Sequence, residues 1–169
     1  GQAQSYGLSN GTTAPKAAIA AVHQEVIDFD VVSDASVAET GIRCERAFRV
    51  ISIHNTPATL LAANGSSYIT QVIRKRDGLG GAAVSCGSLD TNTAGQNISL
   101  AAFVPAAFTL TATAADLVFA VGNVLTFQST ETGTPATPIG KIAVLVEYGW
   151  WVEMAAGEVI ARLSQYGRA

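Results

Sequence analysis

Few side chains in this sequence have the chemistry of a catalyst or a metal ligand, and their spacing decides whether they can act together. The chain holds two histidines, His23 and His54, and neither lies near a pattern of metal ligands or a nucleophile. A catalytic triad needs a nucleophile, a base and an orienting acid in contact, and the sequence has no GxSxG motif. The two cysteines, Cys44 and Cys86, lack CxxC spacing. This argues against a zinc site and predicts two buried, reduced thiols that pack as small hydrophobic groups.

A pair of carboxylates is the next candidate for chemistry. Asp28 and Asp30 lie two residues apart and would share one face of a strand. Such a pair can bind a cation or act as acid and base, but the favoured interpretation is the solvated outer face of an edge strand. The glycine-rich run at 78–81 lacks the GxxxxGK[ST] pattern, so a phosphate-binding loop is not expected. We therefore expect no catalytic residue, no metal and no cofactor, and we expect that the protein is not an enzyme.

Three consecutive cations form a candidate binding site instead. Arg74, Lys75 and Arg76 give a local basic bias in a chain whose formal net charge is −3. Basic residues at a strand end are either solvated or form a patch that docks on an acidic protein surface. A nucleic-acid partner is not expected, because few aromatic residues lie among these cations and the whole chain is acidic.

Two adjacent tryptophans, Trp150 and Trp151, form the other candidate binding site. Adjacent residues on a strand point to opposite faces, so one indole can enter the core while the other faces outward. Tryptophan is enriched among interface hot spots, which favours contact with a partner. Burial of both rings in the core and stacking of one ring on a sugar remain open alternatives.

The composition favours a protein that works against other surfaces. Of the 169 residues, 49% are hydrophobic and only 14% are charged, whereas a typical domain carries about 25% charged residues. Such a chain is not disordered over most of its length, and part of its surface is expected to be covered by partners. It has no apolar stretch of ~18 residues, so no membrane span is expected. Residues 1–13 lack the pattern of a secretory signal, which fits folding in a reducing compartment.

The elements that must position these residues are strands. Apolar and β-branched residues alternate in short runs separated by turn signals such as Asn64-Gly65, and no long amphipathic helix interrupts them. This pattern predicts an all-β fold, an antiparallel β-sandwich of two sheets. The expected strands are residues 25–32, 46–54, 67–76, 108–113, 117–120, 124–130 and 141–148. Residues 87–97 have the composition of a loop.

The two ends of the chain differ from the middle. Residues 1–24 begin with a polar, glycine-rich segment and are interpreted as an extended N-terminal arm, in which Tyr6 and Leu8 are candidate partner contacts. Residues 25–149 would form the sandwich domain. Residues 150–169 carry many apolar groups and are interpreted as a C-terminal tail that docks on its own domain or on a neighbour.

One segment resembles a known class of proteins. Residues 117–148 (LVFAVGNVLTFQSTETGTPATPIGKIAVLVEY) look like the strand–turn–strand endings of small virion proteins of tailed phages. The whole chain, with its polar N-terminal arm, resembles the jelly-roll head-decoration (cement) proteins of such phages. The resemblance implies a homotrimer made in the host cytoplasm, which binds the major capsid protein on the virion surface and cements neighbouring subunits. Tail and head-fibre modules share this strand pattern, so binding of a host glycan or receptor is the alternative.

Overall fold

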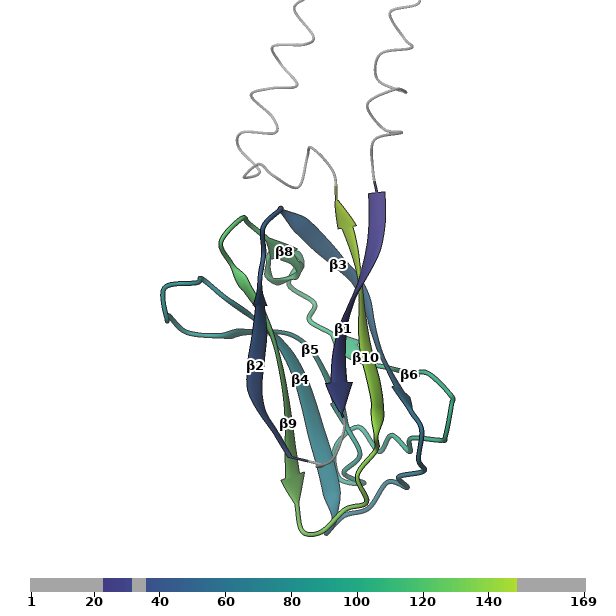
Figure 1. Ribbon diagram of the computed structural model, residues 1–169. Coiled ribbons are helices and arrows are strands. Elements are labelled where there is room, and N and C mark those ends of the chain that lie inside the picture. The colour runs from purple at the N-terminus through teal and green to yellow at the C-terminus, as the bar shows by residue number, and fades with distance from the viewer. Residues whose placement is uncertain (1–22, 32–35, 149–169) are drawn as a thin grey trace, which may run out of the picture.

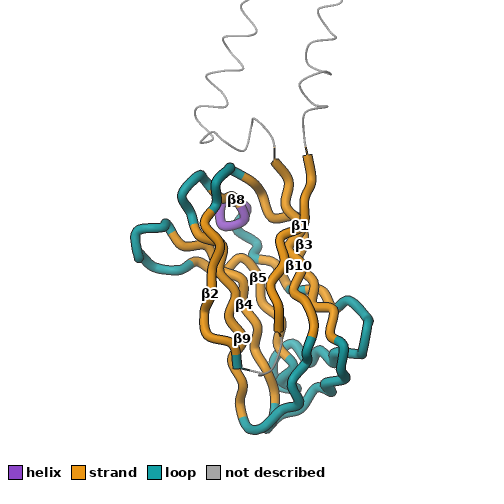
Figure 2. Tube along the Cα trace, viewed as in Figure 1, coloured by secondary structure: helices purple, strands orange, loops and turns teal. Residues whose placement is uncertain are grey.

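The computed structural model describes residues 23–31 and 36–148, and almost all of these residues belong to strands or to the loops between them (Figures 1 and 2). A single short 3-10 turn, Ala114–Leu117, is the one helical element in this part of the chain. The strands are β1 (His23–Val31), β2 (Val37–Arg43), β3 (Phe48–Pro57), β4 (Tyr68–Arg76), β5 (Val84–Asp90), β6 (Ala106–Ala107), β7 (Thr109–Leu110), β8 (Val118–Phe119), β9 (Val124–Thr132) and β10 (Gly140–Tyr148).

The strands form two antiparallel sheets that face each other. Sheet A has the order β1-β10-β3-β6, with β8 also paired to β3, and sheet B has the order β2-β9-β4-β5-β7. The first strand therefore pairs with the last, the second with the last but one, and β4 with β5, as in a long hairpin rolled onto itself. This is a jelly-roll-like arrangement. The predicted all-β, antiparallel sandwich is confirmed.

The core lies between the two sheets because the central strands β3, β4 and β10 bury alternate side chains. In β10, Ile142, Val144 and Val146 are buried and alternate with more exposed residues. Aromatic side chains pack both within and across the sheets. Phe48 stacks on Phe119 with ring centroids 4.7 Å apart, and Phe29 of sheet A meets Phe127 of sheet B at 5.8 Å.

One polar contact crosses this core. The side-chain amide of Asn55 on β3 donates a hydrogen bond of 2.7 Å to Gln71 Oε1 on β4, and both residues are fully buried. The bond joins sheet A to sheet B at a place where two amides would otherwise lose water without compensation.

The sandwich has two distinct ends. His23 pairs with Tyr148, so the chain enters and leaves the sandwich at the same end, which we call the chain-end side (Figure 1). Gly140, at the start of β10, pairs with Pro57 at the close of β3. The nine residues of β10 separate this distal end from the chain-end side by about 27 Å.

The structure differs from the predicted strands in several places. Strands β2 and β5 were not expected, and the loop assigned to residues 87–97 begins only after Asp90, because residues 87–90 belong to β5. The run at 108–113 is strand only at Thr109 and Leu110. Strand β1 begins at His23 rather than at residue 25. Within the described residues, no helix is long and apolar enough to cross a membrane.

Candidate interaction sites

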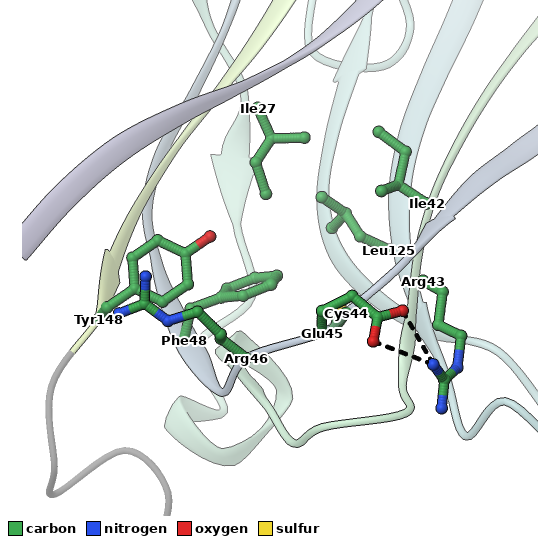
Figure 3. Close-up of a pocket in the computed structure, with 9 residues that line it drawn as sticks. All are labelled: Ile27, Ile42, Arg43, Cys44, Glu45, Arg46, Phe48, Leu125 and Tyr148. Atoms are coloured by element: carbon green, nitrogen blue, oxygen red, sulfur yellow. Dashed lines mark hydrogen bonds and ion pairs between the residues drawn. The ribbon is translucent and has the colours of Figure 1, made fainter.

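A pocket opens between the two sheets at the chain-end side (Figure 3). Its volume is about 220 Å³, and five strands contribute to its walls. Apolar side chains form most of the lining, and the segment after β2 closes one side (Figure 3). The lining residues are Ile27, Ile42, Arg43, Cys44, Glu45, Arg46, Phe48, Leu125 and Tyr148.

The ring of Tyr148 forms one wall of the pocket and contacts three neighbouring side chains. It packs edge-on against Phe48 with centroids 5.9 Å apart, and the Arg46 guanidinium lies 4.3 Å from its ring centroid. His23 stacks beside it at 6.2 Å. Burial, together with the nearby Glu25 carboxylate, raises the pKa of the Tyr148 hydroxyl, so the neutral phenol is favoured.

The remaining polar groups of the pocket do not form a reactive centre. Arg43 and Glu45 pair with each other at 2.8 Å on the rim. Burial raises the pKa of the Cys44 thiol to about 11, so this group is a neutral thiol at neutral pH rather than a nucleophilic thiolate. With apolar walls and a polar rim, the pocket is suited to an apolar ring rather than to bond-breaking chemistry.

Both cysteines are free and buried, as predicted. Burial raises the pKa of the Cys86 thiol to about 12. Its Sγ lies 3.2 Å from the carbonyl oxygen of Asp116.

The three consecutive cations of β4 point to two different faces. Arg74 and Arg76 lie on the outer face of sheet B and share Glu39 of β2, at 4.0 and 2.6 Å. Arg74 also bonds to Gln128 at 2.6 Å. Lys75 donates instead to the carbonyl oxygens of Ala115 and Val118, on the opposite face. The structure therefore brings Arg74 and Arg76 together but separates Lys75 from them.

Glu39 is held as a carboxylate by this cluster. Hydrogen bonds from Arg76 and Thr126 lower its pKa from 4.5 to about 2, and the charges of both arginines add to the effect. The outer face of sheet B therefore presents two guanidiniums around one anion rather than an uncompensated basic patch. Sequence analysis missed Glu39, because its role depends on β2 lying beside β9.

Asp28 and Asp30 also have a cation of their own. Lys141 of β10 lies between them, with Nζ 3.6 Å from Asp28 Oδ2 and 3.2 Å from Asp30 Oδ1. The pair lies on the exposed outer face of the edge strand β1, as the favoured interpretation stated. Among the described residues, no cluster of His, Cys, Asp and Glu side chains could hold a metal ion.

A group of exposed apolar side chains marks the distal end. We call it the distal patch, and it consists of Leu60, Phe103, Val104 and Ile139. These residues come from three connecting segments that meet at the close of β3. The carbonyl oxygen of Pro57 accepts from Phe103 N at 2.7 Å, and Ala58 N donates to the carbonyl oxygen of Ile139.

Phe103 is the most unusual member of the distal patch. Its φ is +60°, in the left-handed region that phenylalanine rarely adopts, and its side chain is 76% exposed. Strained residues of this kind persist where the surrounding structure holds them, often at functional sites. Sequence analysis missed this patch because its members are distant in the chain. The signal available was Phe103 and Val104 standing directly before Pro105 in a segment without strand periodicity.

The other candidates from the sequence fall outside these sites. His54 is half-buried in β3 and pairs with Ala143 and Ala107 across sheet A. Tyr6, Leu8, Trp150 and Trp151 lie outside the described residues, so their roles stay predictions. No protein family, curated protein or solved structure matches the chain.

Proposed function

We propose that this chain is a structural virion protein that binds the outer surface of a phage capsid and joins neighbouring subunits of the major capsid protein. The observation that carries the proposal is the distal patch, in which Phe103 is held at a strained φ with its ring in solvent. Large apolar side chains that are exposed on loops meeting at one end of a fold are candidates for contact with a partner. The resemblance of residues 117–148 to virion proteins supplies the kind of partner.

A protein that joins two subunits needs at least two contact surfaces, and the sandwich offers them at opposite ends. The distal patch lies at one end, and the N-terminal arm and C-terminal tail connect at the other, where His23 pairs with Tyr148. A specific interface buries roughly 1,600 Å² in total, more than four side chains supply. The arm, with Tyr6 and Leu8, would provide additional area, and a homotrimer would engage several sites at once.

Co-sedimentation with purified phage capsids that lack the chain tests the proposal. Phe103→Asn removes the ring but keeps a residue that tolerates the left-handed backbone. We expect this variant to bind about tenfold more weakly, the effect of losing one interface hot spot. Leu79→Asn is the matched control, because Leu79 is also a large apolar side chain, is 93% exposed and lies outside the patch.

Two results would count against the proposal. Equal capsid binding by Phe103→Asn and the wild-type chain would remove the distal patch from the mechanism. Binding to host glycans but not to capsids would favour the alternative function, a tail or head-fibre module, for which no described side chain supplies specific support.

A further inference from the structure

The three connecting segments that carry the distal patch contain no ionisable side chain. They are residues 58–67 between β3 and β4, residues 91–105 between β5 and β6, and residues 133–139 between β9 and β10. Charged residues make up 14% of the whole chain, so several would be expected in segments of this combined length. The polar residues present are Ser, Thr, Asn and Gln. The apolar side chains of the distal patch therefore lie among uncharged groups on all three segments.

The described charges that border these segments belong to the strands. Lys141 on β10 lies with its Nζ 3.2 Å from Asp30 Oδ1, and Asp90 Oδ1 at the close of β5 accepts a backbone hydrogen bond of 2.9 Å. Glu131, near the close of β9, is exposed. Residues 32–35, which include one aspartate, lie outside the described residues. Within the described part of the chain, the contact that the loops themselves offer is uncharged.

The three segments also hold one another in place (Figure 2). Thr59 Oγ1 donates a hydrogen bond of 2.7 Å to the carbonyl oxygen of Thr137, which joins the first segment to the third. Leu61 and Leu100 exchange two backbone hydrogen bonds of 2.9 and 2.8 Å, which join the first segment to the second, and both side chains are buried. Because the loops are already ordered, the surface that they form loses little conformational entropy when it binds.

We propose that the distal patch recognises an apolar, uncharged surface of the major capsid protein and binds it without electrostatic attraction. The inference rests on the proposed function and specifies the chemistry of the partner surface. Contact with a charged surface would remove the partner's charges from water with no opposite charge on the loops, which is costly. Contact with an apolar surface avoids this cost, and the ring of Phe103 contributes most because it is 76% exposed.

This contact would differ from one made by the arginines of β4. Arg74 and Arg76 share Glu39 on the outer face of sheet B, and docking of that face on an acidic protein would depend on charge. Salt screens such attraction, so the affinity of an arginine contact falls as the ionic strength rises. The distal patch has no charge to screen, so its contribution to binding is independent of ionic strength.

Two variants of opposite charge at one position test the chemistry of the partner surface. Val104 belongs to the distal patch and is 54% exposed. We expect Val104→Glu and Val104→Lys each to weaken binding to purified capsids by about tenfold, because either charge loses water against an uncharged surface. A charged partner surface would weaken one of these variants and strengthen the other.

Leu79→Glu and Leu79→Lys are the matched controls. Leu79 is a large apolar side chain, is 93% exposed and lies outside the distal patch, so both variants should leave capsid binding unchanged. Circular dichroism checks that every variant is folded. If a Val104 variant unfolds, Leu60→Glu and Leu60→Lys decide the same question, because Leu60 lies on a different segment of the patch and is 63% exposed.

Ionic strength provides an independent measurement. Between about 0.1 and 1 M NaCl the Debye length falls from about 10 Å to about 3 Å, so contacts between exposed charges weaken. The ratio of the Kd of Phe103→Asn to that of the wild-type chain separates the distal patch from all other contacts with the capsid. We expect this ratio to stay at about tenfold over the whole range of salt.

Two results would overturn the inference and leave the proposed function standing. The first is a loss of capsid binding with one charge at position 104 and a gain with the other. The second is a ratio of Kd values that shrinks as the salt concentration rises. A wild-type chain that binds capsids at no ionic strength would instead overturn the proposed function and this inference together, so the two failures are distinguishable.

Discussion

At the scale of single residues, the buried amide pair of Asn55 and Gln71 is a polar contact whose partners depend on each other. Asn55 Oδ1 and Gln71 Nε2 have no hydrogen-bond partner among the described residues, so the bond from Asn55 Nδ2 to Gln71 Oε1 carries the compensation for burial. Removing one amide leaves the other unpaired, which typically costs 1–3 kcal/mol, whereas removing both is far less costly.

We therefore predict that Gln71→Leu lowers the free energy of unfolding by about 2 kcal/mol. The double variant Gln71→Leu with Asn55→Val should recover most of this loss. Urea unfolding of the single and double variants, arranged as a double-mutant cycle, measures the coupling. Simple additivity of the two single effects would contradict the prediction.

Glu39 makes stability depend on pH in the acid range. Its pKa is lowered from 4.5 in the unfolded chain to about 2 in the folded protein, chiefly by the hydrogen bond from Arg76. The stabilisation is therefore complete above pH 4.5 and is lost as the pH falls toward 2. We predict that Glu39→Gln lowers the free energy of unfolding at pH 7. The variant should also lose less of its stability than the wild-type protein does as the pH falls from 4.5 to 2.

Thermal unfolding at a series of pH values checks the Glu39 prediction. Glu131→Gln, which removes an exposed carboxylate of β9, is the control. If the unfolding temperature of the Glu39→Gln protein falls with decreasing pH as steeply as that of the wild-type protein, other carboxylates dominate acid unfolding and the prediction is wrong.

At the scale of elements, the strands with alternating apolar residues could be predicted and the others could not. Strands β1, β3, β4, β9 and β10 carry this pattern because one face of each is buried over at least part of its length. Edge strand β2 is mostly exposed and lacks it. Strand β5 is built mostly from small residues. At Gly87 a Cβ would lie only 3.1 Å from Ile53 and Leu110, so the neighbouring side chains fill the space above the strand. The strand therefore lacks the alternating large apolar residues by which it could be predicted.

The candidate sites were harder to predict than the strands, because each one assembles residues from distant segments. The pocket draws on five strands, and the distal patch on three loops. Arg74 and Arg76 were identified as candidates, but their pairing with Glu39 depends on the position of a strand that the sequence did not reveal. Periodicity predicts which face is buried, but it does not predict which strands become neighbours.

The loop after β4 contains a close backbone contact that a pair of matched variants can test. Gly78 and Gly80 both have positive φ, +83° and +87°, but a Cβ at Gly78 would clash with the carbonyl oxygen of Gly122, whereas a Cβ at Gly80 would meet no atom within 4 Å. We predict that Gly80→Ala costs about 1 kcal/mol, the strain of the left-handed backbone alone. Gly78→Ala should cost clearly more, and urea unfolding of the two proteins compares them. Equal losses of stability in the two variants would contradict the prediction, because they would mean that the loops containing Gly78 and Gly122 can move apart without cost.

At the scale of the whole molecule, the contacts proposed for a partner are divided between the two ends of the sandwich. The arm joins at the chain-end side, and the described strands begin only at His23. We predict that deleting residues 2–16 leaves the sandwich folded, because none of its described strands is removed, but abolishes the protection of capsids against heat. Circular dichroism and a capsid disruption assay measure the two outcomes separately. Full protection by the shortened chain would remove the arm from the proposed mechanism.

The position of β10 also determines when the protein can fold. This strand lies between β1 and β3 in sheet A, although β1 ends at Val31 and β3 at Pro57, long before β10 begins at Gly140. During synthesis both strands must wait for residues 140–148 to leave the ribosome, with their pairing edges unoccupied in the meantime. Pairing between such distant segments is slow, and exposed edges at that stage invite association between nascent chains. Of the strands that the structure describes, the last to be made is thus the one that completes the sheet.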